Sequence, residues 1–430
     1  MKFPLLKTTV AVLVLSPTLA QATNGYFAHG YGVRNKSMGG VGAALSQDAV
    51  AAAVNPAGMA FVDNRLDLEL ELFSPHREYT VSGMPTGSPQ DMFPLAPGTR
   101  ESGDDYFVVP TVGWNHRLDD TQTVGVTLYG NGGMNTTYRN FDNKNFCPPG
   151  SAGGSFCGGK TGIDLMQAFI VPSYAKSFYN QKFSLGIAPI FAVQSFKAKG
   201  LGAFGGFSSD AGNLSNSGRD YSYGAGVRVG TQAEVLPHVK LGFSYKSRIF
   251  MSPFSYYQGL FAEQGDFDIP ESFNGGIAWE IQDGLTTAFD VEHINYSSVA
   301  SVGNSLLPNL QTAKLGNNGG AGFGWQDMTV YKFGVQWKQN QTWTWRGGFS
   351  YGEQPIQSSQ VLFNTLAPGV QQWHITAGLS HELTKQDELS LGLMYSPTQS
   401  VSGKNPLSPT QEIDLQMYQV SLQAAWSHRF

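Results

Sequence analysis

Residues 154–161, GSFCGGKT, match the spacing of a phosphate-binding loop, with Gly154, Gly159, Lys160 and Thr161 in register. That chemistry needs an apolar strand before the loop and a helix after it, so that backbone amides converge on the phosphates. Here a Pro- and Gly-rich segment precedes the pattern and an alternating strand follows it. Nucleotide binding is therefore not expected.

A second pattern, Gly348-Phe349-Ser350-Tyr351-Gly352, has the spacing of a hydrolase nucleophile. Such a serine must lie on a sharp turn between a strand and a helix. Ser350 instead falls within an alternating strand that runs into a long polar loop. We predict no catalytic residue and no enzymatic activity, with a lipid hydrolase as a rival.

The two cysteines of the chain, Cys147 and Cys157, flank the loop sequence CPPGSAGGSFC. If the protein is exported to an oxidising compartment, a disulfide between them is expected; two incidental free thiols are the alternative. The eight histidines are scattered without metal-ligand spacing. No metal and no cofactor are predicted.

The first 22 residues have the pattern of a secretory signal peptide. Lys2 and Lys7 precede an apolar run, and Ala20-Gln21-Ala22 fits a cleavage site. No cysteine stands at the cleavage point, which excludes a lipoprotein. The formal net charge of -5 gives no reason to expect nucleic acid as a partner.

The composition differs from that of an ordinary soluble protein. Charged residues make up 14% and aromatic residues 13%, and there are 52 glycines, whereas soluble proteins average about 25% charged residues. Beyond the signal peptide, no apolar run reaches the roughly 18 residues of a membrane-spanning helix. These properties together favour a barrel in the bacterial outer membrane.

Alternation of side chains supports this interpretation. In RLDLELELF, residues 65–73, leucines occupy every second position and carboxylates occupy the positions between them. A strand would place the leucines in lipid and Asp67, Glu69 and Glu71 in a wet lumen. A soluble amphipathic strand remains the alternative for this segment alone.

The pattern recurs to give fourteen expected strands, an even number as in single-chain bacterial barrels. Short polar turns alternate with long Gly-, Ser- and Pro-rich loops, as at the periplasmic and extracellular ends of such barrels. The barrel domain is expected to span residues 65–430. Beyond the first strand, the expected strands are 105–118, 121–134, 163–179, 182–199, 220–236, 238–254, 267–281, 285–298, 326–338, 342–352, 371–384, 387–397 and 413–430.

The chain ends on an aromatic residue at the end of an alternating strand. Trp426, His428 and Phe430 share one face of it. This pattern resembles the C-terminal assembly signal of outer-membrane barrels, so the outer-membrane assembly machinery is an expected partner.

Residues 23–64 lack strand alternation and are rich in Gly and Ala. A fourteen-stranded barrel would otherwise enclose an open channel, so we expect this segment to be an N-terminal hatch of small helices plugging the lumen. Within it, Asn55-Pro56-Ala57-Gly58 would end one helical turn, and the Asn side chain could bond the freed backbone groups. A simple loop is the alternative for the dipeptide.

The hatch segment NGYFAHGYGVRNKSMGGVGAALSQDAVAAAVNPAGMA resembles that of the FadL-type transporters of long-chain fatty acids and aromatic hydrocarbons (OMPP/FadL/TodX), with Asn55-Pro56-Ala57 at the family's Asn-Pro-Ala motif. The similarity continues in residues 241–249, 267–279 and 325–351. It implies passive uptake of hydrophobic molecules through the outer membrane. The ligand would be captured by extracellular loops, bound inside the barrel against the hatch and released when the hatch shifts.

The resemblance also implies sideways release where the third strand kinks inward. The matching strand here contains Gly130, Gly132 and Gly133, and glycines weaken a strand interior. We take them as a candidate wall opening. The alternative is that they begin an extracellular loop.

A fatty-acid carboxylate would need a cation in an apolar pocket. If Leu241, Phe243, Tyr245 and Ile249 face lipid, Lys246 and Arg248 face the lumen, and by similar phasing so does Lys332. These three residues are the candidate carboxylate ligands. They could instead balance lumen carboxylates, and an uncharged hydrocarbon would need none of them.

The expected protein is therefore a monomeric transporter of hydrophobic small molecules, surrounded by outer-membrane lipid and lipopolysaccharide. Long-chain fatty acids are the first expected substrate class, and aromatic or aliphatic hydrocarbons are the second. A general or sugar-selective porin is a further rival, which predicts an open channel without a hatch.

Overall fold

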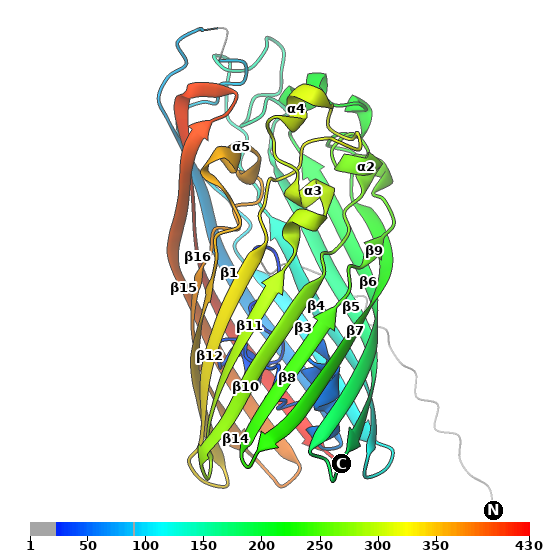
Figure 1. Cartoon of the computed structure of the whole chain (residues 1–430). Coiled ribbons are helices and arrows are strands. Elements are labelled where there is room, and N and C mark those ends of the chain that lie inside the picture. The colour runs from blue at the N-terminus through cyan, green and yellow to red at the C-terminus, as the bar shows by residue number, and fades with distance from the viewer. Residues whose placement is uncertain (1–22, 89–90) are drawn as a thin grey trace, which may run out of the picture.

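A computed structural model describes residues 23–88 and 91–430, so the expected signal peptide, residues 1–22, lies outside the described part. Fourteen antiparallel strands form a closed barrel, because the last strand pairs with the first (Figure 1). Two further short strands, β2 Gly98–Glu101 and β9 Phe250–Met251, pair with β1 and β7. The barrel strands are β1 Arg65–Ser82, β3 Phe107–Arg117, β4 Gln122–Asn135, β5 Gly162–Phe178, β6 Phe183–Lys199, β7 Asp220–Leu236, β8 Val239–Lys246, β10 Ser272–Gln282, β11 Leu285–Ile294, β12 Met328–Lys338, β13 Trp343–Gly352, β14 Trp373–Glu382, β15 Asp387–Asn405 and β16 Ser408–Arg429.

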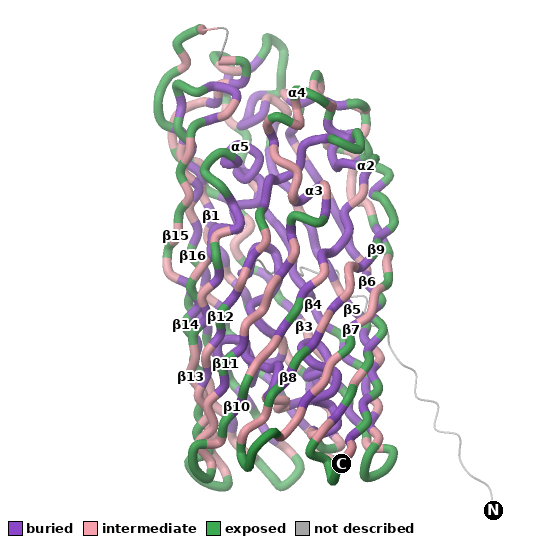
Figure 2. Tube along the Cα trace, viewed as in Figure 1, coloured by how far each residue is buried: buried purple, intermediate pink, exposed green. Residues whose placement is uncertain are grey.

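The alternation predicted from the sequence is confirmed in β1. Leu68, Leu70 and Leu72 are exposed on the outer wall, whereas Asp67 and Glu71 are buried inside the barrel. Figure 2 shows the same alternation of exposed and buried positions along the neighbouring strands. The outer wall is therefore apolar, as lipid requires, and the polar side chains of β1 point inward.

Exposed aromatic side chains mark both edges of this apolar wall. Aromatic belts of this kind lie at the two membrane–water interfaces of outer-membrane barrels. Near the short turns the exposed tryptophans are Trp114, Trp279, Trp337, Trp345 and Trp426. Near the long loops the exposed aromatics include Tyr106, Tyr221, Tyr223, Phe250, Tyr331 and Trp373.

The structure corrects one expected connection. A long loop was expected between residues 397 and 413, but β15 continues to Asn405 and β16 begins at Ser408. The two strands stay paired past a register shift between Ser396 and Gln399. The extra pairs extend the hairpin beyond the apolar wall, so this connection is a tight turn.

The expected strand 238–254 was also too long, because β8 ends at Lys246. Beyond it, the backbone of Ile249 forms a β-bridge with Ile269 of the following loop, and pairing with β7 resumes only at Phe250 and Met251. This change of partner turns Ile249 into the apolar core, where it is fully buried. The prediction that Ile249 faces lipid is therefore wrong.

The long loops, at the end of the barrel opposite the short turns, contain short helices that pack together above the barrel (Figure 1). No helix among residues 23–88 and 91–430 is long and apolar enough to cross a membrane. The α-helices are α2 Ala262–Gly265, α3 Ala300–Gly303, α4 Asn309–Thr312 and α5 Val361–Asn364, and the 3-10 helices are η3 Gly202–Phe207, η4 Ala211–Asn213, η5 Ser255–Tyr257, η6 Tyr296–Ser298 and η7 Ser358–Gln360.

Residues 23–64 form a hatch inside the barrel, drawn in dark blue in Figure 1. It contains one turn of α-helix, α1 Val33–Lys36, and two 3-10 helices, η1 Ala51–Ala53 and η2 Pro56–Phe61. Most of its residues are buried, although few of them are large and apolar. Small side chains allow this irregular backbone to approach the barrel wall closely.

Candidate functional site

Asn55 fixes the break between the two 3-10 helices of the hatch. Its side-chain oxygen accepts a hydrogen bond from the amide of Ala57 at 3.1 Å and so caps η2, while Pro56 occupies the first helical position, where its missing N–H costs nothing. Its side-chain amide donates to the carbonyl of Ala43 at 2.7 Å and to that of Thr231 on β7 at 3.0 Å. One buried side chain therefore joins two parts of the hatch to the wall.

Glycines on the wall make room for this contact. A methyl group at Gly230 would collide with the Asn55 side chain, and one at Gly186 would collide with the backbone at Pro56 and Ala57. Larger residues at these positions would lift the Asn-Pro-Ala segment away from β6 and β7. The hatch therefore rests directly on the backbone of the barrel.

Charged wall residues hold the rest of the hatch. The carboxylate of Asp290 on β11 accepts hydrogen bonds from the amides of Gly42 and Ala43, each at 2.8 Å. Arg34 of α1 forms a buried ion pair with Glu388 of β15 at 2.6 Å. These contacts join the hatch to strands far apart around the barrel.

The carboxylates of β1 serve the same purpose. Asp67 accepts from the amide of Ala49 at 2.7 Å, Glu69 accepts from the amide of Val33 at 3.3 Å, and Glu71 pairs with Lys36. The expectation that these acids face a wet lumen is corrected: they point inward, but they bind the hatch.

The three glycines proposed as a wall opening lie within β4, which continues to Asn135. The ladder with β5 has a bulge between Gly130 and Gly132. The alternative that these glycines simply begin a loop is wrong. A bulge bends the strand and releases its backbone groups for other partners.

Those partners belong to the hatch. The amide of Gly133 donates to the carbonyl of Tyr26 at 2.9 Å, and the amide of Ala28 donates to the carbonyl of Asn131 at 3.0 Å. A methyl group at Gly132 would collide with the Tyr26 carbonyl. The first residues of the hatch thus pair with the bulged part of β4 through an isolated β-bridge between Phe27 and Gly132.

The bulged part of β4 is not paired with β3, its neighbour on the side opposite β5. The ladder between β3 and β4 ends at the pair Val112 and Leu128, so from Tyr129 onward β4 pairs only with β5 and the hatch. Arg77 of β1 bridges the resulting seam, since its guanidinium donates to the carbonyls of Asn135 and Asp104. The hatch and Arg77 thus help to close this seam, together with a β-bridge between Ser102 and Tyr138 just beyond the end of β4.

Directly above the hatch, aromatic rings close the lumen. The ring centroids of Tyr26 and Phe27 lie 5.2 and 5.5 Å from that of Tyr296, and Trp325 lies 5.7 Å from Tyr26. Tyr26, Tyr296 and Trp325 are essentially inaccessible to solvent. Two of these residues belong to the hatch and two to the loops, so opening the lumen requires one group to move from the other.

The three candidate cations differ in their surroundings. Lys332 forms an ion pair with Glu292 at 2.7 Å, and Arg248 forms one with Asp268 at 2.7 Å, with its side chain partly exposed at the wall. Lys246 is buried, and its ammonium group lies 4.0 Å from the centre of the Phe27 ring. Across residues 23–88 and 91–430, no carboxylate lies within ion-pair distance of Lys246.

Farther toward the loops lies an apolar crevice of about 20 Å³. Pockets for drug-sized ligands measure about 300–1,000 Å³, so a large hydrophobic molecule enters this crevice only if the loops part. No lining residue is charged. They are Ile163, Phe196, Leu201, Phe204, Leu260, Phe261, Ser301, Ala321, Gly322, Phe323, Phe363 and Leu366.

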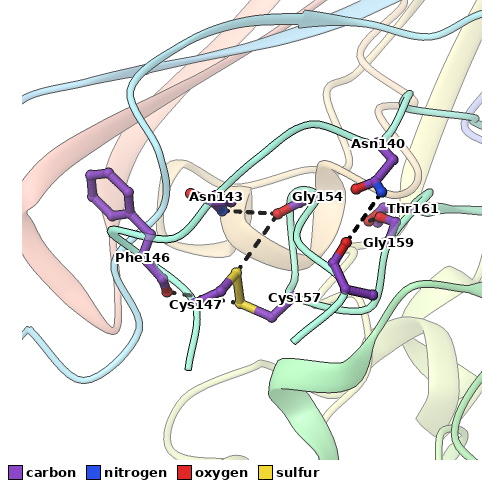
Figure 3. Close-up of a disulfide and its surroundings, with 9 residues drawn as sticks. Asn140, Asn143, Phe146, Cys147, Gly154, Cys157, Gly159 and Thr161 are labelled. Carbon is purple, nitrogen blue, oxygen red and sulfur yellow. Dashed lines mark hydrogen bonds between the residues drawn. A yellow bond between two sulfur atoms is a disulfide. The ribbon is translucent and has the colours of Figure 1, made fainter. Parts of the chain in front are cut away.

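The expected disulfide between Cys147 and Cys157 is present, in the loop between β4 and β5 (Figure 3). The side-chain amide of Asn143 donates to the carbonyl of Gly154 at 2.9 Å and closes the same loop.

The segment that matches a phosphate-binding loop folds back on itself here, because Gly154 packs against the Gly159 carbonyl. It is followed by β5 and not by a helix, so it lacks the context that nucleotide binding needs.

Ser350 lies inside β13, and its hydroxyl is 3.2 Å from Nδ1 of His374 on β14. Both residues are fully buried, and the His374 ring stacks on that of His29 in the hatch with centroids 5.6 Å apart. Among the described residues, no carboxylate bonds His374. Through His374, the pair helps to hold the hatch in place. Ser350 does not lie on the turn that exposes a hydrolase serine.

The residues of the expected assembly signal lie on the outer face at the end of β16. Trp426 stacks near His428, which contacts Phe430 at 5.4 Å between ring centroids. Phe430 is 65% exposed, so its ring is available to lipid or to another protein.

Several residues that hold the site together were not predicted from the sequence, among them Arg34, Arg77, Asp290 and His374. Alternation on their strands would have placed the wall residues inside the barrel. No local pattern indicates which part of the hatch each one meets.

The sequence matches the family model described as outer membrane protein transport protein (OMPP1/FadL/TodX) over residues 19–425. No curated protein sequence matches it.

Solved structures with the same fold include the toluene transporter TodX of P. putida, with a TM-score of 0.68, 17% identity and coverage of 94% of this chain and 99% of that one. A FadL homologue of Pseudomonas aeruginosa has a TM-score of 0.67 and 16% identity, over 94% of this chain and 100% of that one. The toluene transporter TbuX of Ralstonia pickettii has a TM-score of 0.62 and 18% identity, over 94% of this chain and 99% of that one. At these identities the likeness shows a shared fold.

Proposed function

The chain belongs to the OMPP1/FadL/TodX family of outer-membrane transport proteins, and from that premise we propose that it takes up long-chain fatty acids. Family and fold make it an outer-membrane barrel that transports hydrophobic molecules. The choice of fatty acids, the route and the residues below are our proposal. We further propose that it acts as a monomer and without enzymatic activity.

The observation that carries this proposal is the environment of Lys246. It is a buried ammonium group inside the barrel, its two neighbouring candidates are already paired with carboxylates, and it lies against an aromatic ring of the hatch. A carboxylate is the natural partner of such a cation, and an aromatic wall suits an acyl chain. A fatty acid supplies both groups.

In the proposed route, the ligand first enters the apolar crevice among the loops. Its carboxylate then reaches Lys246 by replacing Phe27, which draws the first residues of the hatch away from their aromatic partners. Because Tyr26 and Ala28 also bond β4, the same movement releases the bulged part of that strand. The hydrophobic molecule leaves through the seam between β3 and β4, where Gly130, Gly132 and Gly133 lie.

Hydrocarbons are the second candidate class. TodX and TbuX are named as toluene transporters, and the crevice among the loops has no charged lining residue. A neutral ligand would use the same route but would not need Lys246.

Uptake of labelled oleate and of labelled toluene, by cells that lack their own fatty-acid transporter and express this chain, tests the proposal. Oleate uptake above the empty-vector control is expected. Toluene uptake alone would move the assignment to hydrocarbons. Large steady currents through the purified protein in planar bilayers would indicate a porin, and ester cleavage lost in Ser350→Ala would indicate a hydrolase.

A further inference from the structure

A cavity of about 220 Å³ opens where β4, β5 and β6 end near the long loops. It shares the buried residue Ile163 with the apolar crevice among the loops, but its charged side chains are not part of the candidate fatty-acid site. Its lining residues are Asp104, Thr136, Thr137, Lys160, Gly162, Ile163, Asp164, Lys197, Lys199 and Arg219, which we name the rim cavity.

The rim cavity lies on the outer face of the barrel. On β6, Phe196 and Ala198 are buried inside, and side chains of a strand alternate between the two faces, so Lys197 and Lys199 project outward. Farther down the same outward row the exposed side chains are apolar, namely Leu185, Ile187 and Phe191. The two lysines therefore stand just beyond the extracellular edge of the lipid-facing wall.

The neighbouring strand shows the same boundary. Tyr221 and Tyr223 of β7 are exposed and belong to the extracellular aromatic belt, and Arg219 comes immediately before them in the outward row. Aromatic belts mark the interface between hydrocarbon and head groups. The rim cavity is therefore at the height of the head groups of the outer leaflet.

Positive charge predominates in the cavity. Arg219 pairs with Asp164 and donates to the hydroxyl of Ser195 at 2.9 Å, while Asp104 accepts a hydrogen bond from the hydroxyl of Thr137 at 2.5 Å. The three lysines, Lys160, Lys197 and Lys199, form no ion pair with any carboxylate in residues 23–88 and 91–430. Their ammonium groups are thus available to an anion from outside.

The position of Lys160 is fixed by the loop that carries it. A methyl group at Gly200, directly after β6, would lie 2.5 Å from the carbonyl of Lys160, so the two backbones touch. The disulfide at Cys157 closes the loop three residues earlier. Lys160, singled out by the phosphate-loop pattern, is thereby held beside the two lysines of β6.

We propose that the rim cavity binds the phosphate group of an amphiphile in the outer leaflet of the outer membrane. Lysine ammonium groups are strong donors to phosphate oxygens, and basic pockets at the edge of a membrane protein bind anionic head groups. The apolar outward rows of β5 and β6 directly below would contact the acyl chains of the same molecule. A free phosphate has the same head-group chemistry but gains nothing from that apolar wall.

Diphosphorylated lipid A is the probe, titrated onto the purified full barrel and followed by native mass spectrometry. The double variant Lys197→Gln/Lys199→Gln removes two charges from the cavity. The matched control, Lys176→Gln/Lys182→Gln, removes two charges near the short periplasmic turn between β5 and β6. Heat-modifiable mobility on gels establishes that each variant is folded.

Binding at least about tenfold weaker in the cavity variant, with the control like the wild type, is the expected result for two lysines near a membrane surface. Lipid A stripped of its phosphates should bind the wild type as weakly as the cavity variant binds intact lipid A. Equal lipid binding by cavity variant and control would overturn the site. Competition by millimolar inorganic phosphate as strong as that of the lipid would overturn the membrane source and assign a soluble anion. None of these measurements depends on what the barrel transports.

Discussion

The ammonium group of Lys246, on β8, lies 4.0 Å from the centre of the Phe27 ring in the hatch. A cation over an aromatic face is attracted by the ring, and more strongly when water is excluded. A carboxylate would bind this cation more tightly than the ring does. The contact therefore links ligand binding at the wall to the position of the hatch.

Replacing Lys246 by Met tests that link. Loss of a hydrogen bond to a charged group costs about 1.5–3 kcal/mol, so oleate uptake at low concentration should fall by about tenfold or more, while toluene uptake persists. Lys240→Met is the matched control, because Lys240 lies on the same strand over the hatch ring of Phe61 at 5.3 Å, near the periplasmic end. Unchanged oleate uptake in Lys246→Met would remove this lysine from the proposed site.

Gly132→Ala should separate the hatch from β4. The new methyl group collides with the Tyr26 carbonyl. Overpacking of this kind lowers the stability of the folded state by about 1–3 kcal/mol. Hydrogen exchange at the amides of Ala28 and Gly133 should become faster than in the wild type. In Gly347→Ala on β13, where the nearest atom would be 3.9 Å away, exchange at these amides should stay slow; equal exchange in both variants would contradict the proposed role of the bulge.

Asn55→Ala should loosen the hatch without unfolding the barrel. The carbonyls of Ala43 and Thr231 lose a buried donor, at about 1–3 kcal/mol for each unsatisfied group. The variant should remain heat-modifiable on gels but show altered oleate uptake. Asn340→Ala, in an exposed periplasmic turn, is the control; transport like the control would mean that Asn55 only shapes a turn.

Deleting Phe430 should reduce assembly several-fold, because its exposed ring is the last element of the outward row on β16. The amount of heat-modifiable protein in isolated outer membranes measures this effect. Phe430→Tyr keeps an aromatic ring and should assemble normally. Wild-type levels of the deleted form would show that the terminal ring is not an assembly signal.

The sequence by itself determined the architecture. Alternation with a period of two residues follows directly from strand geometry, so segments such as RLDLELELF revealed both the strand and its lipid-facing side. The predicted side was wrong for Ile249, where the backbone changed its pairing partner. The lack of alternation in residues 23–64 predicted the hatch, because a barrel of this width would otherwise enclose an open channel.

Only the tertiary structure decided which polar groups meet. Lys246, Arg248 and Lys332 look equivalent in the sequence, yet two are paired with carboxylates and one faces Phe27, which is more than two hundred positions away in the chain. The pairing of Gly133 with Tyr26 likewise depends on how the hatch sits in the closed barrel. A local pattern reports which face a side chain occupies, whereas its partner depends on long-range register and packing.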